Sequence, residues 1–263
     1  MTMATQLATK CSRIAVDVQA PVARITLNNP PLNIIDILMM EELAETLSAI
    51  ESRSDITTTI LNGSQQAFSV GVDVAAHVPE KVEQMLAKFH AVIRALVNSR
   101  KVTIAAVHGQ CLGGGAELAM VCDLVYTSER AIWAFPEIKL GCYPPVAVTA
   151  LAALVGQKHA ADLVLTGRSI TGKEAASIGL ANSVAPAIDL EHVVQNTVDH
   201  LSQLSPAALA ITKKAIYSWD SIHFDKGLAR AEKIYFDELM NTEDAREGIN
   251  AFLEKRPPMW KGK

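Results

Sequence analysis

The sequence predicts an α/β domain followed by a helical C-terminal region. The first part of the chain alternates short runs of β-branched residues with amphipathic stretches, which is typical of layered α/β folds. From Pro144 onward the pattern is helical almost throughout. Apolar residues make up 49% of the 263 residues, which is enough for one large buried core. We therefore expect an α/β core with a helical appendage.

The first strands and helices follow from short-range patterns. Ala20-Pro21 separates two β-rich runs and marks a turn between them. After Asp36, a residue suited to cap a helix, apolar side chains recur every three or four residues. The expected strands are 13–18, 22–28 and 57–63, and the expected helices follow Asp36 and span 80–99.

The middle of the chain holds the most apolar predicted strand. Residues 102–109 are almost continuously apolar, as in a strand that is covered on both faces of a sheet. Two further strands are expected at 121–128 and 131–135. The helical segments that follow are separated by glycine or proline. They are expected near 145–155, 158–165, 173–178, 189–203, 206–218, 221–241 and 243–254.

Composition and charge exclude several classes of function. The net charge is −4 and no basic block interrupts the chain, so a nucleic-acid partner is not expected. The four cysteines lack the spacing of a zinc site or a disulfide framework, which indicates a reducing compartment and no metal. The N-terminus lacks the apolar segment of a signal peptide, and the longest apolar run is too short to span a membrane. We expect a cytoplasmic protein without a membrane partner.

Three consecutive glycines, Gly113–Gly115, precede Glu117 between two apolar segments. A P-loop is excluded because it needs Lys-Ser/Thr after its last glycine, and a dinucleotide fingerprint is excluded by the spacing. Glycines let a ligand approach the unpaired N–H groups of a helix start, where developing negative charge on an oxygen is stabilised. An ordinary strand-to-helix crossover with an N-terminal glutamate is the alternative.

Two other segments have related features. In AFSVGVDV (67–74), a glycine opens the backbone after a predicted strand, and the N–H that follows belongs to Val72. In WAFPEIKLG (133–141), Glu137 is bordered by apolar residues, which makes it a candidate for a raised pKa. Taken alone, Glu137 is better explained as a solvated carboxylate in a turn, and only its coincidence with the other two motifs favours a catalytic role.

Together, AFSVGVD, HGQCLGGGAELAMVCDLVY and FPEIKLG resemble the enoyl-CoA hydratase/isomerase (crotonase) superfamily in order and spacing. The resemblance extends over nearly the whole chain and implies a crotonase-like ββα spiral core over 1–200. It also implies a helical C-terminal region over 201–263 that forms trimers, giving a homotrimer or a dimer of trimers. The implied substrate is an acyl-CoA thioester; coenzyme A is part of the substrate, and no cofactor is expected.

By that resemblance, the backbone N–H groups of Val72 and Gly114 form an oxyanion hole around the thioester oxygen. Hydratases of the family have two glutamates, and both positions are occupied here. Glu117 is assigned to water activation and Glu137 to proton transfer with the substrate carbon. The remaining expected substrate-binding residues are Gly71, Asp73, Gly113, Tyr143 and Pro145.

The chain departs from the family pattern after Glu137, where Pro145, Ala147 and Val148 replace expected glycines. This Pro-Pro turn, with NNPPLNIID near the start, is similar to hydratases of cyclic dienoyl-CoA thioesters. Those enzymes act on cyclohexa-1,5-diene-1-carbonyl-CoA in anaerobic aromatic (benzoyl-CoA) degradation and yield a hydroxycyclohexene-carbonyl-CoA. A general short-chain enoyl-CoA hydratase, and an isomerase or thioester hydrolase on the same fold, are the alternatives. A scaffold that has lost its chemistry is disfavoured by the intact glutamates.

Overall fold

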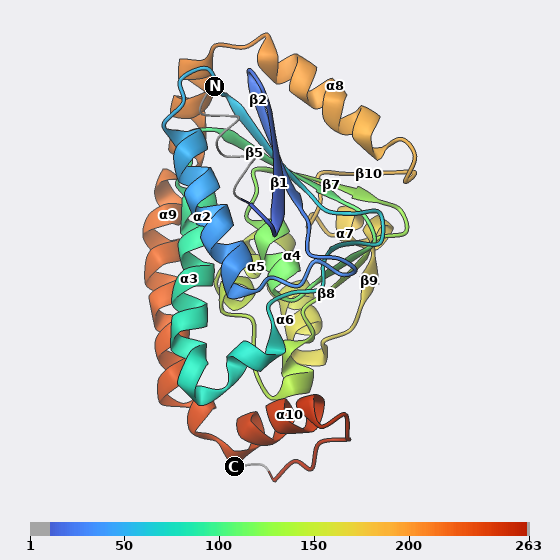
Figure 1. Cartoon of the computed structure of the whole chain (residues 1–263), viewed down its shortest axis with the longest axis vertical. Helices are drawn as coiled ribbons and strands as arrows, with labels where there is room; N and C mark the ends of the chain where they lie inside the picture. Colours follow the sequence, from blue (N-terminus) through green and yellow to red (C-terminus); the bar gives the residue numbers. More distant parts are fainter. Residues whose placement is uncertain (1–10, 262–263) are drawn as a thin grey trace.

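The larger of two β-sheets in the computed structural model has six strands in the order β1-β2-β3-β5-β7-β10 (Figure 1). The structure describes residues 11–261, with only the backbone of Pro79 and of residues 218–223. The first two strands form an antiparallel hairpin, and every later pairing is parallel. The strands are β1 (Ile14–Gln19), β2 (Val22–Leu27), β3 (Thr58–Asn62), β5 (Val102–Val107), β7 (Leu124–Ser128) and β10 (Ser183–Ala185).

The smaller sheet, in the order β4-β6-β8-β9, supplies a second short strand after β3, β5 and β7. A helical segment follows each of these strand pairs, so the chain repeats a strand–strand–helix unit. The first strands of successive units are neighbours in the large sheet, and the units therefore stack as turns of a spiral. The expected ββα spiral is confirmed. The short strands are β4 (Ala67–Ser69), β6 (Gln110–Leu112), β8 (Ile132–Ala134) and β9 (Ile170–Thr171).

Helices cover the sheets and extend below them. Figure 1 shows α2, α3 and α9 side by side along one flank, with α8 at the opposite end from α10. Apolar side chains from α2 and α3 close the main core against the sheet. The helices are α2 (Ile37–Glu51), α3 (Pro79–Val97), α4 (Gly114–Met120), α5 (Pro145–Val155), α6 (Gln157–Thr166), α7 (Gly172–Ser177), α8 (Leu190–Ser202), α9 (Pro206–Asp237) and α10 (Glu243–Leu253). Three 3₁₀ turns are η1 (Val74–His77), η2 (Pro136–Leu140) and η3 (Leu239–Asn241).

Two sequence predictions of element boundaries were wrong. The helices expected at 206–218 and 221–241 form one helix, α9, because no glycine or proline stands between them to end it. The strand expected at 121–128 begins only at Leu124, since α4 runs to Met120 and Val121 is its C-cap. Both errors come from assigning a boundary where no capping residue marks one.

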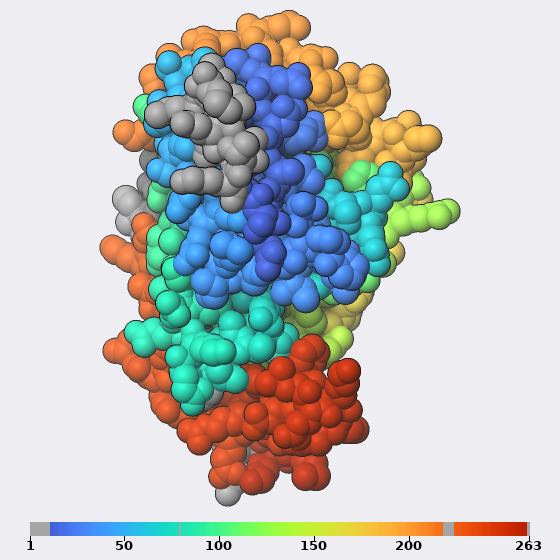
Figure 2. All heavy atoms as spheres, viewed as in Figure 1, coloured from blue at the N-terminus to red at the C-terminus, as the bar shows by residue number. Residues whose placement is uncertain are grey.

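The expected division of the chain at residue 200 falls in the last turn of α8. Beyond it, α10 lies against η1 and η2, and Figure 2 shows this helix (red) at the lower end of the molecule beside the start of α3. The division itself stays a prediction. Residues 1–10, on which the expected absence of a signal peptide depends, lie outside the described residues. Within residues 11–261, no helix combines the length and the apolar character needed to cross a membrane.

A buried ion pair fixes α9 to the large sheet. Lys213 Nζ lies 2.7 Å from Asp123 Oδ2 and donates a hydrogen bond to the carbonyl oxygen of Lys101 at 2.8 Å. The same Asp123 oxygen accepts bonds from the backbone N–H and the hydroxyl of Thr103, at 2.7 and 2.9 Å. The side chains of Lys213 and Asp123 are only 7% and 13% exposed, so removal of either one would leave the other buried without a counter-charge.

We predict that Asp123→Ala destabilises the protein by about 3–5 kcal/mol, because it leaves the ammonium of Lys213 buried without a counter-charge. Urea denaturation followed by circular dichroism measures this difference. The control is Glu41→Ala, which removes a 2.7 Å ion pair with Lys88 in which the glutamate is 46% exposed. It should cost less than about 1 kcal/mol. Equal losses in the two variants would show that the buried pair has no special role.

Candidate active site

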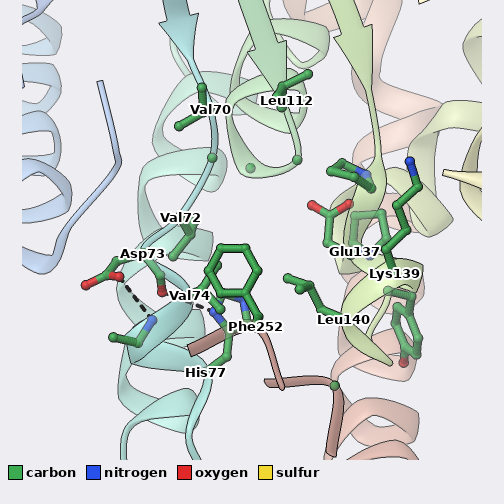
Figure 3. A pocket seen from close by; sticks show the side chains of 18 of the residues that line it. Val70, Val72, Asp73, Val74, His77, Leu112, Glu137, Lys139, Leu140 and Phe252 are labelled. Carbon is green, nitrogen blue, oxygen red and sulfur yellow. Dashed lines mark hydrogen bonds between the residues drawn. The ribbon is translucent and has the colours of Figure 1, made fainter. Parts of the chain in front are cut away.

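A cavity of about 590 Å³ opens where α4, η2, the start of α5 and the end of α10 meet. This volume is typical of a site for a small molecule. Figure 3 shows Val72 and Glu137 on opposite sides of the cavity, with Phe252 of α10 between them in this view. The residues predicted from sequence are all brought together on its wall: Gly71, Val72, Asp73, Gly113, Gly114, Glu117, Glu137, Tyr143 and Pro145.

The N–H group of Val72 is directed into the cavity by its pairing with Ile35. Ile35 donates to the carbonyl oxygen of Gly71 at 2.9 Å and accepts from the N–H of Asp73 at 3.2 Å. In an extended strand the intervening residue points its N–H the other way. Within the described residues the Val72 N–H donates no hydrogen bond, so it is available to a ligand.

The second N–H without an acceptor among the described residues belongs to Gly114, the first residue of α4. Gly113 caps this helix with φ +51°, a conformation that favours glycine, and its own N–H donates to Ala134 at 2.9 Å. A Cβ atom on Gly114 would lie 3.4 Å from the nitrogen of Val72 and 2.7 Å from its Cγ2. The two residues are therefore neighbours, and a side chain at position 114 would displace Val72.

Glu117 lies one turn into α4 and is 3% exposed. Its Oε1 accepts hydrogen bonds from the N–H groups of Val146 and Ala147, both at 2.9 Å. These are the first donors of α5, since Pro145 has none. Burial raises the pKa of Glu117 to about 7, and the two backbone bonds oppose this rise because they favour the ionised form.

Glu137 lies in η2 across from Glu117. Its Oε2 is shielded from solvent and, among the described residues, has no hydrogen-bond partner. A Cβ on Gly113 would lie 2.5 Å from Glu137 Oε1, so the absence of a side chain at position 113 makes room for this carboxyl. Burial first, and the charge of Glu117 second, raise the pKa of Glu137 well above its ordinary value.

Glu117 and Glu137 therefore form a coupled pair with unequal partners. Only Glu117 receives backbone donors, which stabilise a carboxylate, whereas Glu137 Oε2 has none. At neutral pH the pair shares about one proton, and the geometry favours its location on Glu137. The site thus combines an acid, a base and two N–H donors around one cavity.

The sequence matches the enoyl-CoA hydratase/isomerase family over residues 17–263. The chain belongs to this family. The crystal structure of an enoyl-CoA hydratase from Mycobacterium avium subsp. paratuberculosis K-10 has the same fold, with a TM-score of 0.86 and 25% identity over 95% of this chain and 99% of that one. The family and the fold predicted from sequence are confirmed.

Two relatives of the enoyl-CoA hydratase/isomerase family bear different names. "Probable enoyl-CoA hydratase, mitochondrial" from Dictyostelium discoideum is 35% identical, covering 92% of this chain and 88% of that protein. Cyclohexa-1,5-dienecarbonyl-CoA hydratase from Thauera aromatica is 34% identical, covering 91% and 93%. The resemblance to hydratases of cyclic dienoyl-CoA thioesters is thus a measured similarity, as is the one to a general hydratase.

Some predicted site residues have structural tasks in this family member. Asp73 accepts from the N–H of Ala75 at 3.0 Å and caps η1, which holds the backbone beside Val72 (Figure 3). The hydroxyl of Tyr143 donates to the carbonyl oxygen of Ala231 at 2.6 Å. Their roles toward a substrate stay predictions.

Sequence reasoning missed several residues of the site. The N–H groups of Val146 and Ala147 hold Glu117, but backbone donors carry no residue-type signal beyond the preceding prolines. Tyr235 and Phe252 line the cavity from α9 and α10, far along the chain from the recognised motifs. Their only available signal was an aromatic residue on a helical stripe, which is usually a core residue.

The raised carboxyl pKa values predict a pH-dependent stability. Because the pKa of Glu117 rises from 4.5 to about 7, and that of Glu137 also rises, the folded state holds more protons than the unfolded chain in this window. Stability contributed by the carboxyl groups is present below about pH 4.5 and is lost as the pH rises through the folded-state pKa values. Glu137→Gln should therefore be more stable than the wild type at pH 8, by about 1–3 kcal/mol. At pH 4.5 this difference in stability should be smaller.

Urea denaturation of both proteins at pH 4.5, 6 and 8 checks this expectation. The control is Glu83→Gln, which removes an exposed carboxyl from α3 and should leave the difference from wild type independent of pH. A constant difference for Glu137→Gln would contradict a proton shared by the pair.

Proposed function

We propose that the protein is an acyl-CoA hydratase that adds water to a conjugated enoyl- or dienoyl-CoA thioester. The preferred substrate is cyclohexa-1,5-diene-1-carbonyl-CoA, as used in anaerobic aromatic degradation. The observation that carries the proposal is the coupled pair of Glu117 and Glu137 beside two N–H groups that have no partner among the described residues. Family membership supports the acyl-CoA substrate. No cofactor takes part in the proposed reaction.

The first task of the site is to hold the thioester carbonyl. Its oxygen accepts hydrogen bonds from the N–H groups of Val72 and Gly114, two neighbouring residues of the cavity wall. When water attacks the conjugated carbon, the electron pair of the double bond moves toward this oxygen. Donors fixed in advance stabilise that charge without having to reorient, and each contributes a few kcal/mol to transition-state stabilisation.

The second task is to add the hydroxyl group of a water to one substrate carbon and a proton to another. Ionised Glu117 accepts a proton from the water while the water oxygen forms a bond to the substrate carbon. Protonated Glu137 gives its proton to another carbon of the conjugated system, and the double bond becomes saturated or moves. The atoms of one water enter the product, and one proton moves from the Glu137 side to the Glu117 side of the pair. Exchange between the two carboxyls or with solvent restores the resting state.

A cyclic dienoyl substrate is favoured by the turn that joins η2 to α5. Pro144 and Pro145 line the cavity, and Pro145 is buried. This turn is stiff and apolar, which suits a flat hydrocarbon ring that needs no polar partner. Similarity to the Thauera aromatica hydratase supports the same substrate.

A straight-chain enoyl-CoA thioester is the second candidate. The observation in its favour is the comparable identity, 35%, to the Dictyostelium discoideum protein named as an enoyl-CoA hydratase. Isomerisation and thioester hydrolysis use the same oxyanion hole but do not require the pair. Two carboxyls at one cavity therefore favour hydration over either reaction.

We also propose a homotrimer or a dimer of trimers located in the cytoplasm, without membrane or nucleic-acid partners. The family resemblance supports the assembly, and the net charge of −4 disfavours a nucleic-acid partner. Sedimentation equilibrium tests the assembly directly, since monomer, trimer and hexamer differ widely in mass.

We predict that the wild type hydrates the cyclic dienoyl-CoA faster than crotonyl-CoA, and that Glu117→Gln and Glu137→Gln each lower kcat by about 10²–10⁴. Both changes keep the shape of the side chain and remove its ability to exchange a proton. The measurement is spectrophotometric turnover of both thioesters, repeated in H₂¹⁸O with mass analysis of the product. Glu83→Gln serves as the control and should retain wild-type rates.

The labelled product separates the candidate reactions. One ¹⁸O on a ring or chain carbon indicates hydration, ¹⁸O in a free acid indicates thioester hydrolysis, and a rearranged product without ¹⁸O indicates isomerisation. Turnover of crotonyl-CoA alone would reject the cyclic substrate in favour of the general hydratase. No labelled thioester from either substrate would reject hydration.

We predict that Gly114→Ala lowers kcat by about 10²–10³, because its methyl group would lie 2.7 Å from Val72 Cγ2 and 3.4 Å from the Val72 nitrogen and would force the two N–H donors apart. Val72→Ala is the matched variant, since it keeps the N–H and removes only the methyl groups that narrow the pocket. It should retain kcat within about threefold, the order expected when no donor is lost. Steady-state kinetics with the better substrate compares the two, and equal losses would contradict the assigned role of the N–H groups.

A further inference from the structure

Two tyrosine rings line the same cavity as the glutamate pair. Tyr143 follows η2, and Tyr235 comes from the last turns of α9. Their ring centroids are 5.3 Å apart with an interplanar angle of 80°, an edge-to-face arrangement. Tyr143 is half-buried, whereas Tyr235 is 1% exposed. One ring thus borders the open space, and the other supports it from behind.

Along the chain, Tyr143 lies between Glu137 and the two N–H groups that bind Glu117. Just before it, the N–H of Cys142 donates to the backbone oxygen of Glu137 at 3.1 Å. Just after it comes the Pro-Pro turn, followed by the N–H groups of Val146 and Ala147 that hold Glu117. The backbone of Tyr143 is therefore fixed at both ends relative to the acid and the base. Tyr143, Glu117 and Glu137 all line the one cavity, so the ring belongs to the same wall as the acid and the base.

The hydroxyl group of Tyr143 is occupied elsewhere. Tyr143 donates to the carbonyl oxygen of Ala231 in α9 at 2.6 Å. The ring of Tyr235 is held by its contact with Tyr143 and by an edge-on contact with Phe236, whose ring centroid lies 5.8 Å away. The hydrogen bond and the ring contacts orient the two rings. What the pair offers to a ligand is an aromatic surface of fixed orientation.

We propose that the Tyr143–Tyr235 pair is a specificity-determining element that recognises a flat, unsaturated six-membered ring on the acyl-CoA thioester. The inference deepens the proposed function and rests on it for the placement of the thioester. A flat ring presents C–H edges and a π face that match the edge-to-face geometry of the pair. A flexible chain gains only apolar burial there and loses rotational freedom.

Binding of two thioesters with equal numbers of acyl carbons tests the proposal. Benzoyl-CoA has a flat ring of the required size, and heptanoyl-CoA is its flexible counterpart. Isothermal titration calorimetry gives Kd for both ligands with the wild type, Tyr143→Leu, Tyr143→Met and Tyr143→Phe. Circular dichroism melting confirms that each variant is folded. We expect Tyr143→Leu and Tyr143→Met to weaken benzoyl-CoA binding by about 3–10-fold, the scale of one aromatic pair, and heptanoyl-CoA binding by less than about twofold.

Tyr143→Phe keeps the ring and loses the bond to Ala231, so its preference for benzoyl-CoA should stay within about twofold of wild type. Equal weakening of both ligands in the leucine and methionine variants would overturn the proposal and leave the pair a packing feature. A preference lost equally in Tyr143→Phe would also overturn it, since the hydroxyl would then be responsible. Because binding of benzoyl-CoA needs no hydration, failure of the turnover assays rejects the proposed reaction without affecting this result.

Discussion

Two carboxyl groups that line one cavity repel each other when both are ionised, and the site is organised around this constraint. The surroundings distinguish the two: Glu117 receives the first backbone donors of α5, and Glu137 Oε2 receives none. The charge is thereby assigned to one residue and the proton to the other. A general acid and a general base are obtained from the same residue type by environment alone.

The spiral explains how segments far apart in sequence reach this cavity. Gly71 and Val72 follow β4, Gly113 and Gly114 follow β6, and Glu137 follows β8. These three short strands are parallel neighbours in the smaller sheet, so their carboxyl ends lie at the same edge. Each turn of the spiral thus delivers one motif to one place. The larger sheet supplies the packed core that keeps these turns in register.

Sequence patterns predicted the parts of this arrangement that depend on residue type. At position 113 the structure requires glycine, because a side chain would collide with Glu137 and because φ is +51°. Such a requirement is visible in the sequence as a glycine. Long apolar runs such as 102–109 also predicted their strand correctly. In the smaller sheet, β8 lies within the strand expected at 131–135. The strands β4, β6 and β9 were missed because two or three residues are too few to establish a period of two.

Contacts between distant segments were beyond such patterns. Nothing in the sequence connects Tyr235 with Tyr143, since their pairing depends on how α9 lies across the start of α5. Val146 and Ala147 bind Glu117 through their main-chain N–H groups, which every residue but proline possesses. The pairing of Lys213 with Asp123 likewise depends on the course of α9 over the sheet. The composition predicted a large apolar core, whereas the course of the chain determines which polar groups are brought together within it.

The continuity of α9 has a consequence for how this protein tolerates change in chain length. One end of the helix is fixed at Lys213, and the other presents Tyr235 to the cavity. A single residue inserted between these points would rotate the far end by about 100° and advance it by about 1.5 Å, turning Tyr235 away. Substitutions on the outer face leave this phase intact. Between Lys213 and Tyr235, α9 therefore tolerates substitutions on its outer face far more readily than insertions or deletions. The number of residues between these two positions determines where Tyr235 lies in the cavity.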